Sequence, residues 1–344
     1  MSHFSSSAEA KTSAGASIID PPYQRVCGID VSKQTLDAHL LTPEGEHVLH
    51  VDQNPAGLQK LVDACRRHQI QYAVLEATGG LQRSAHRALH QAGIAVAVVN
   101  PGRVRYFARA EGLIAKNDPI DARNIAYFAL RLAPPVTPPP SDAQEQMARL
   151  SSRRGQLVQG LIAEKNREEQ EFDPWCLKDI RKHITWLNRQ IARIDKELDK
   201  LVSAQEELEH KARIADEFTG IGRVSAVALV VCMPELGRIN RRKAAALAGL
   251  APYDNDSGTC KGPRSIRGGR TRIRMALYMP TLTAIRYPGD IQDMYQRLLA
   301  RGKRKMQALV ACMRKMLIKV NARVAEALAA KEARTTKQVG QAGL

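Results

Sequence analysis

Apolar and polar residues follow two different periods in the first part of the chain. Between residues 25 and 53, three short runs separated by turns predict three strands in a meander. The pattern then predicts a helix over 57–68, a strand over 72–76, a helix over 81–92, a strand over 94–99 and a helix over 119–132. This order predicts an α/β domain whose parallel strands are buried under helices.

Three strands followed by alternating helices and strands is the element order of a ribonuclease-H-like domain, which we expect over residues 23–133. Residues 1–22 are polar and are expected to form a disordered tail. The segment PPVTPPP at 134–140 stops regular structure and predicts a stiff linker. The first domain is therefore expected to end there.

Residues 141–217 have a purely helical pattern. Apolar residues recur at alternating steps of four and three, at Ile180, Ile184, Leu187, Ile191, Ile194, Leu198 and Leu201. This heptad spacing predicts a coiled coil. An antiparallel hairpin within one chain and a dimerisation arm explain it equally well, because periodicity does not determine the partner.

The last part of the chain is also predicted to be helical, with a domain over 218–325 and a tail over 326–344. It opens with TGIG at 219–222 between two helical patterns, which resembles a helix-hairpin-helix device. There, Gly220 and Gly222 would expose backbone N–H groups to a phosphate, although glycine also simply caps helices. The expected fold class is thus an α/β domain followed by an all-α region.

Charge is concentrated in this last part. The 344 residues have a net charge of +17, and residues 218–315 contain 19 basic but only 5 acidic side chains. Such an excess favours a polyanionic partner, here nucleic acid.

No apolar run approaches the roughly twenty residues that cross a bilayer, so no membrane partner is expected. The 6 cysteines are scattered, which fits reduced thiols in the cytoplasm.

Four carboxylates of the α/β domain lie where a metal-dependent phosphodiester enzyme needs them. Asp30 follows an apolar strand start, Glu76 ends the strand AVLE, and Asp118 and Asp121 open the last predicted helix. Strand ends and helix N-termini form the crevice of an open α/β sheet, so the four are expected to converge on Mg²⁺ or Mn²⁺. Separately, Asp118 before Pro119 is also a helix cap, and Asp121 suits the helix dipole.

Five ordered motifs resemble one family of proteins. They are GIDVSK at 28–33, LEATG at 75–79, KNDPIDAR at 116–123, TGIG at 219–222, and AGLAPYDNDSGTCKGPRSIRGG with RMALYMP, which ends at Pro280. From about Val26 to Lys319, the chain resembles the DEDD-type transposases of bacterial insertion sequences, a group that includes the Piv-like DNA invertases. The resemblance implies a RuvC-like N-terminal domain with an acidic tetrad at Asp30, Glu76, Asp118 and Asp121.

The same resemblance implies a catalytic serine in an SG dipeptide of the C-terminal domain, here Ser257 before Gly258. It further implies a covalent phosphoserine intermediate with DNA, assisted by the metal site. A serine hydroxyl is a weak nucleophile and needs a base or a metal to activate it. From the residues alone DNDSG is an ordinary turn, and Tyr253 and Ser265 stay open as rival nucleophiles.

Basic side chains of the C-terminal domain are expected to contact the DNA backbone more than the bases. They are Arg264, Arg267, Arg270, Arg272, Arg274, Arg301, Lys303, Arg304 and Lys305. The first three are also placed to neutralise charge on the phosphate under attack. Because aromatic residues make up only 4% of the chain, the choice of sequence is poorly explained by the protein. The resemblance implies that a non-coding guide RNA makes that choice by base pairing.

The sequence therefore predicts a Mg²⁺-dependent transposase or site-specific recombinase that cleaves and rejoins double-stranded DNA through Ser257. We expect a dimer or tetramer joined through the coiled coil, in the bacterial cytoplasm and at the nucleoid. Two alternatives stay open. One is a junction resolvase or nuclease that uses metal-activated water, and the other is a DNA-organising protein whose carboxylates are only caps and turns.

Overall fold

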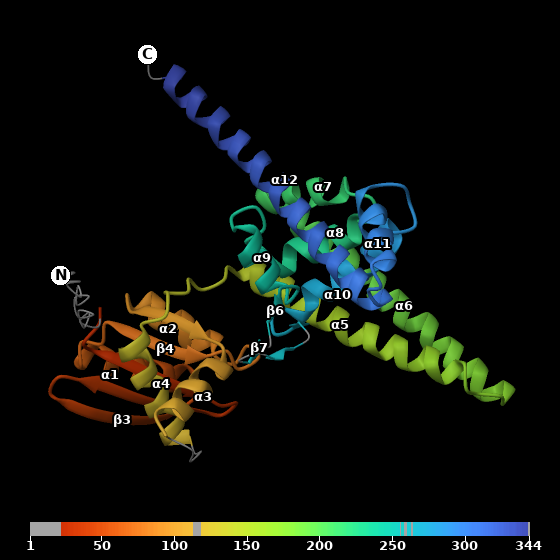
Figure 1. Cartoon of the computed structure of the whole chain (residues 1–344). Coiled ribbons are helices and arrows are strands. Elements are labelled where there is room, and N and C mark those ends of the chain that lie inside the picture. The colour runs from red at the N-terminus through yellow and green to blue at the C-terminus, as the bar shows by residue number, and fades with distance from the viewer. Residues whose placement is uncertain (1–21, 113–117, 255, 258–259, 263, 343–344) are drawn as a thin grey trace, which may run out of the picture. The chain divides into compact units, whose positions relative to one another are not determined.

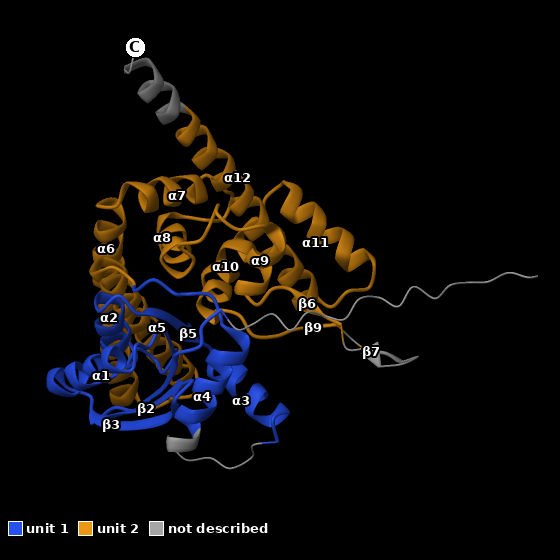
Figure 2. Ribbon diagram, turned by 90° about the vertical axis from the view of Figure 1, so that its left-hand side faces the viewer, with its two compact units in different colours: residues 1–139 blue, residues 140–344 orange. Residues whose placement is uncertain are grey.

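The structure is a computed structural model that describes residues 22–112, 118–254, 256–257, 260–262 and 264–342. Residues 118–120, 256–257, 260–261 and 334–342 are described by their backbone alone. The chain divides into two compact units, Met1–Pro139 and Pro140–Leu344, which Figure 2 colours separately. Within the described ranges, no helix is both long and apolar enough to span a membrane. Nearly all of the tail expected at 1–22 lies outside the described residues.

Unit 1 is built on a five-stranded sheet in the order β3-β2-β1-β4-β5 (Figure 1). The strands are β1 (Val26–Val31), β2 (Thr35–Thr42), β3 (Gly45–Asp52), β4 (Tyr72–Glu76) and β5 (Ala95–Val99). β1, β2 and β3 form an antiparallel meander, whereas β1, β4 and β5 are parallel. The predicted meander and the predicted parallel strands that follow it are thereby confirmed.

Helices cover both faces of this sheet. They are α1 (Pro55–Arg67), α2 (Arg83–Gln91), α3 (Pro101–Ala110) and α4 (Asp118–Leu132). Successive strand residues point to opposite faces, so β1 contributes Ile29 to a buried cluster with α1 and α2 and Val26 to another with α3 and α4. α3 was not predicted, although Asn100 caps it and Pro101 occupies its first turn.

The proline-rich segment, which was predicted to be a stiff linker, is hydrogen-bonded to unit 1 over its first half. Tyr72 donates a hydrogen bond to the carbonyl oxygen of Pro134. The Thr137 backbone N–H donates to the Val96 carbonyl oxygen at 2.8 Å, and Nε2 of His86 lies 2.8 Å from the Thr137 carbonyl oxygen. Backbone pairing therefore ties this segment to β5, and unit 1 extends to Pro139.

A polar cluster joins α4 to the meander. Arg123 donates to both carboxylate oxygens of Glu46 at 3.2 and 3.3 Å, and the Tyr127 hydroxyl donates to Oε1 at 2.8 Å. Nε2 of His39 lies 2.8 Å from the other oxygen, Oε2. The hydrogen bonds from Arg123 and then Tyr127 lower the pKa of Glu46 to about 2, although burial acts in the opposite direction. α4 is thus pinned to β2 and β3 by one carboxylate.

We expect Glu46→Gln to lower the melting temperature at pH 7 and to have a smaller effect in acid. The folded-state pKa of Glu46 is depressed, so its contribution is complete above its unfolded pKa of about 4.3 and is lost as the pH falls toward 2. The contribution should not exceed about 1 kcal/mol, because the pair is partly exposed to solvent. Thermal unfolding of both proteins at several pH values measures it, and a difference that is constant down to pH 2 would contradict it.

Unit 2 begins with two long helices, α5 (Asp142–Glu168) and α6 (Pro174–Ser203), that pack as an antiparallel hairpin. Arg154, near the middle of α5, pairs with Asp195, and Glu168, at the end of α5, pairs with Arg181. The partner on α6 comes earlier in the chain as the partner on α5 comes later, so the two helices run antiparallel. The helix with the heptad spacing therefore packs against α5 of the same chain. A role as a dimerisation arm stays a prediction.

The other helices of unit 2 share a single core with this hairpin (Figure 1). They are α7 (Glu206–Asp216), α8 (Arg223–Cys232), α9 (Arg241–Leu247), α10 (Thr271–Ala284), α11 (Asp290–Ala300) and α12 (Lys305–Ala342). Met147 of α5 and Leu198 of α6 belong to the same buried cluster as Leu229 of α8 and Leu317 of α12. Moreover, α12 continues through 326–342, where a tail was expected.

Candidate active site

Asp30 and Glu76 lie beside each other at the carboxyl edge of the sheet. The parallel register of β1 and β4 places Ile29 opposite Leu75, so the next residue on each strand is one of the two carboxylates. Neighbouring strands are about 4.8 Å apart, which brings the two side chains within reach of one ion. Alternate residues of these strands pack under α3 and α4, and Asp30 and Glu76 belong to that face.

α4 lies directly on β1 and runs antiparallel to it. A Cβ atom on Gly28 would lie only 2.1 Å from the Ala126 nitrogen and 2.4 Å from the Ala122 carbonyl oxygen, so a side chain at Gly28 would prevent this contact. Pro134, just beyond the end of α4, is bonded to Tyr72 at the start of β4. Because the end of α4 lies near the start of β4, its first turn lies toward the carboxyl edge.

Measured along the strand direction, the first turn of α4 lies at about the same position as the carboxylates Asp30 and Glu76. Asp118 precedes Ala122 by one helical turn, or about 6 Å along the axis, and Asp30 lies about 7 Å beyond Gly28 along β1. Asp121 lies in the first turn of α4, between Asp118 and Ala122, and is half-buried. The structure thus brings the backbone of all four tetrad residues to one edge of the sheet, while the Asp118 side chain lies outside the described part.

The tetrad is not gathered into a finished metal site. Among the described residues, no group of three or more His, Cys, Asp or Glu side chains is close enough to hold an ion. Carboxylates that share a site repel one another unless a cation neutralises them. The donor set consists of hard oxygen atoms, so its chemistry fits Mg²⁺ or Mn²⁺ rather than a soft metal.

Two further polar side chains continue the row across the sheet, and sequence reasoning missed both. The register places Asp37 of β2 opposite Asp30, and His50 of β3 opposite Asp37. Asp37 is only 8% exposed, and its Oδ1 lies 2.7 Å from Nδ1 of His50. Two carboxylates directly opposite each other in a sheet repel, and His50 offers Asp37 a hydrogen bond in compensation. Pairing the three strands of the predicted meander in register would have revealed both residues.

The segment between α9 and α10 contains two short antiparallel ribbons. β6 (Pro252–Tyr253) pairs with β9 (Ser265–Ile266), and β7 (Asp256–Ser257) pairs with β8 (Cys260–Lys261). Ser257 is thus in the distal ribbon, with its backbone opposite Cys260, but its side chain and Gly258 lie outside what is described. The rivals Tyr253 and Ser265 face each other across the proximal ribbon.

Three of the predicted DNA-binding arginines are engaged within the protein. Arg270 makes a two-pronged ion pair with Glu235 at 2.7 and 2.8 Å. Burial is the strongest single influence on the pKa of Glu235 and raises it, but the hydrogen bond and charge of Arg270, a backbone hydrogen bond and the charge of Lys211 together lower the pKa. Arg272 donates to the Ser152 hydroxyl at 2.9 Å, and Arg274 donates to the Gly268 carbonyl oxygen at 2.7 Å. These contacts attach the ribbons to the helices, and a role in DNA binding stays a prediction.

The other predicted cations are more available. Arg264, just before β9, pairs with Asp254, just after β6. Within the described residues, no ion-pair partner is found for Arg267, Arg301, Lys303, Arg304 or Lys305. Their charge is therefore free to meet an external anion.

The TGIG segment joins α7 to α8. Gly220 has a φ of +89°, and a Cβ there would lie 2.2 Å from the Pro280 carbonyl oxygen, so this glycine permits close packing on α10. Gly222 caps α8 with no side-chain hydrogen bond, and no described atom lies within 4 Å of where its Cβ would be. Packing therefore accounts for Gly220, while Gly222 leaves the first N–H groups of α8 open, and a phosphate contact stays a prediction.

Comparison with known families identifies the class as a transposase. A family described as "Transposase", of the DEDD type, matches residues 27–175. A second, described as "Transposase IS116/IS110/IS902 family", matches residues 212–296, and the two matches together cover more than half of the chain. The chain therefore belongs to the IS110/IS116/IS902 family of transposases.

The chain is also similar to individual relatives and to one solved structure. The pilin gene-inverting proteins of Moraxella bovis and Moraxella lacunata are each 28% identical to the chain over 303 residues, covering 84% of the chain and 92% of the relative. A protein of insertion element IS116 from Streptomyces clavuligerus is 30% identical over 140 residues, 40% of this chain and 34% of that protein. T. thermophilus RuvC in complex with a Holliday junction substrate matches 32% of this chain and 96% of its own, with 16% identity and a TM-score of 0.26.

Proposed function

We propose that the chain cleaves and rejoins DNA strands through a phosphoserine intermediate on Ser257, with the acidic tetrad of unit 1 assisting. The observation that supports this most is the juxtaposition of Asp30 and Glu76 with the first turn of α4 at one edge of the sheet. Helix capping is enough to explain acidic residues at the positions of Asp118 and Asp121. It does not explain why the first turn of α4 lies at the same edge of the sheet as the two strand carboxylates.

Asp30, Glu76, Asp118 and Asp121 would hold Mg²⁺ or Mn²⁺. When bound, such an ion stabilises negative charge on the oxygens around the phosphorus under attack. The carboxylates themselves supply the charge that retains the ion and orients it at the sheet edge. His50 keeps Asp37 hydrogen-bonded beside this set, which limits the repulsion that Asp30 experiences.

The covalent step follows from the chemistry of a serine and a phosphodiester. Oγ of Ser257 forms a bond to phosphorus and its proton passes to a base, while the bond from phosphorus to the leaving strand oxygen breaks and that oxygen takes a proton. Attack by the free hydroxyl of another strand reverses these changes and releases the serine. Arg267 follows β9 and has no ion-pair partner among the described residues, and in this proposal it would neutralise charge on the phosphate.

Guide RNA and an oligomeric assembly are further parts of the proposal. The basic character of residues 218–315 supports binding to more than one polyanion. The α5–α6 hairpin exposes Phe172 and Trp175 near its turn, at 89% and 74%, which supports a contact with another chain. Ser257 and the tetrad belong to different units.

A denaturing gel after incubation with DNA and Mg²⁺ tests the proposal. We expect the full-length protein to form a protein–DNA adduct that Ser257→Ala abolishes, whereas Tyr253→Phe and Ser265→Ala retain it, because only one hydroxyl becomes bonded to phosphorus. Strand cleavage with no adduct would instead indicate a resolvase-like nuclease that uses water. Neither cleavage nor adduct, with DNA still bound, would indicate a DNA-organising protein.

A further inference from the structure

A groove of about 660 Å³ lies in unit 2 beside the ribbon that leads to Ser257. One wall is the proximal ribbon, with Pro252, Arg264 and Ile266, and the other is formed by the end of α11 and the start of α12. Its volume is in the range of pockets that hold small organic ligands, and a nucleotide is a ligand of that size. None of the residues that we have placed at the tetrad lines it.

The floor of the groove is apolar and open to solvent. It is formed by Leu250, Pro252, Ile266, Leu298, Met306, Val310 and Ala311. Ile266 is 37% exposed and Met306 is 56% exposed, so these side chains are not consumed by the core. An exposed apolar surface of this kind gains free energy when a flat apolar ligand covers it.

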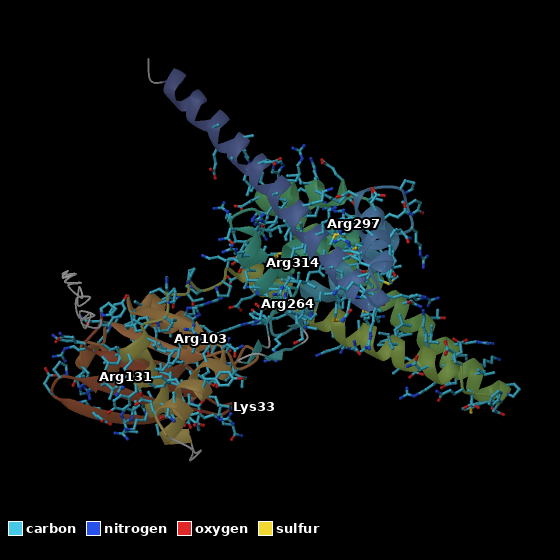
Figure 3. The ribbon with its side chains drawn as sticks, viewed as in Figure 1. Lys33, Arg103, Arg131, Arg264, Arg297 and Arg314 are labelled. Carbon is cyan, nitrogen blue, oxygen red and sulfur yellow. The ribbon has the colours of Figure 1, made fainter. Side chains whose placement is uncertain are left out.

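Cations surround this floor. Arg264 reaches it from beside the ribbon, Lys303 from the turn after α11 and Arg314 from α12, and none of the described residues that line the groove is acidic. Figure 3 labels Arg264 and Arg314, which come from these separate elements. Within the described residues Lys303 and Arg314 have no ion-pair partner, whereas Arg264 has Asp254. The groove is thus complementary to a ligand with an apolar face and negative charges along its edge.

We propose that this groove binds unpaired nucleotides of the DNA strand that flanks the phosphate attacked by Ser257. Bases would lie on the apolar floor while phosphates meet Arg264, Lys303 and Arg314. A duplex does not fit this chemistry, because its base faces are stacked on one another and only its phosphates are available. The groove therefore favours a strand whose bases have been unstacked.

The choice of DNA rests on the proposed function. Pro252 lines the groove and Ser257 is five residues further along the chain, which is at most about 18 Å of extended backbone. A strand attached to Ser257 would therefore have its neighbouring nucleotides within reach of the groove. Ser265 and Gln307 add neutral hydrogen-bonding groups at the rim, which suit base edges.

Fluorescence titration of the full-length protein with a single-stranded DNA oligonucleotide that contains 2-aminopurine tests this proposal. EDTA is present, so neither metal nor chemistry is required. We expect Met306→Ala to raise the dissociation constant about fivefold or more and to abolish the change in base fluorescence, because the apolar contact between a base and the Met306 side chain is lost. Arg314→Gln should raise it as well and should reduce the slope of log affinity against log salt by about 0.7.

Two matched variants serve as controls. Met279→Ala removes a similarly exposed methionine, 62% exposed, from α10, and Arg286→Gln removes a cation that follows the same helix. Both should leave the fluorescence change intact, as should Ser257→Ala. The proposal fails if Met306→Ala binds like the wild type, if duplex DNA competes equally well, or if RNA of the same sequence binds as tightly. Since this assay needs no adduct, it separates failure of the groove from failure of the serine mechanism.

Discussion

Asp30→Asn is expected to lower the rate of DNA strand cleavage by about a thousandfold or more, and Glu76→Gln by a similar factor. Each change removes a carboxylate charge from the pair that the register of β1 and β4 places together. The amide is nearly the same size, so the sheet should keep its structure. The rate of cleavage at saturating Mg²⁺, measured with the full-length protein, provides the test.

A second measurement separates loss of the ion from loss of the fold. Mg²⁺ should raise the melting temperature of the wild type, because a ligand that binds only the folded state stabilises it, and this rise should be lost in Asp30→Asn. Asp63→Asn is the matched control, since Asp63 lies on α1 and accepts a hydrogen bond from Gln59 away from the tetrad. If Asp30→Asn cleaves DNA at the wild-type rate, the tetrad has no catalytic role.

Gly28→Ala is expected to destabilise unit 1 by about 3 kcal/mol or more, and to impair cleavage as well. The added Cβ would lie 2.1 Å from the Ala126 nitrogen, and backbone atoms cannot move aside as the end of a flexible side chain can. α4 must therefore shift away from β1, which also carries Asp121 away from Asp30. Urea unfolding, with hydrogen exchange of peptides from β1 and α4 as the local probe, measures the effect.

Gly155→Ala is the matched control and should have the opposite sign. Gly155 lies in α5, and no described atom is within 4 Å of where its Cβ would be. Alanine in a helix interior is favoured over glycine by about 0.5–1 kcal/mol, so this variant should be slightly stabilised. Wild-type stability in Gly28→Ala would show that α4 does not rest on β1 as described.

Much of unit 1 was predictable because its strands and helices have distinct periods in the sequence. The strand over 72–76 was predicted with the bounds that the structure shows, and α4 differs by one residue at its start. α3 was missed, since its short apolar pattern was outweighed by the many charged residues of 101–110. Both faces of the sheet are apolar and must be covered by helices, so few other arrangements of these elements are possible.

The candidate site was only partly predictable. Asp30 and Glu76 were found because strand ends are local features, but Asp37 and His50 depend on the pairing of three strands. The roles of Arg270, Arg272 and Arg274 also required structure, because a sequence shows a positive charge and not the partner that it meets.

The sequence by itself determined the order of strands and helices, the concentration of positive charge after residue 218 and the family to which the chain belongs. These are local or ordered properties, which periodicity, composition and motifs record directly. Only the tertiary structure decided that α4 runs antiparallel to β1, that α5–α12 share one core, and that an apolar groove rimmed by cations lies beside the proximal ribbon, which leads to Ser257. Each of these depends on contacts between residues far apart in the chain, where packing and register, not local propensity, select the neighbour.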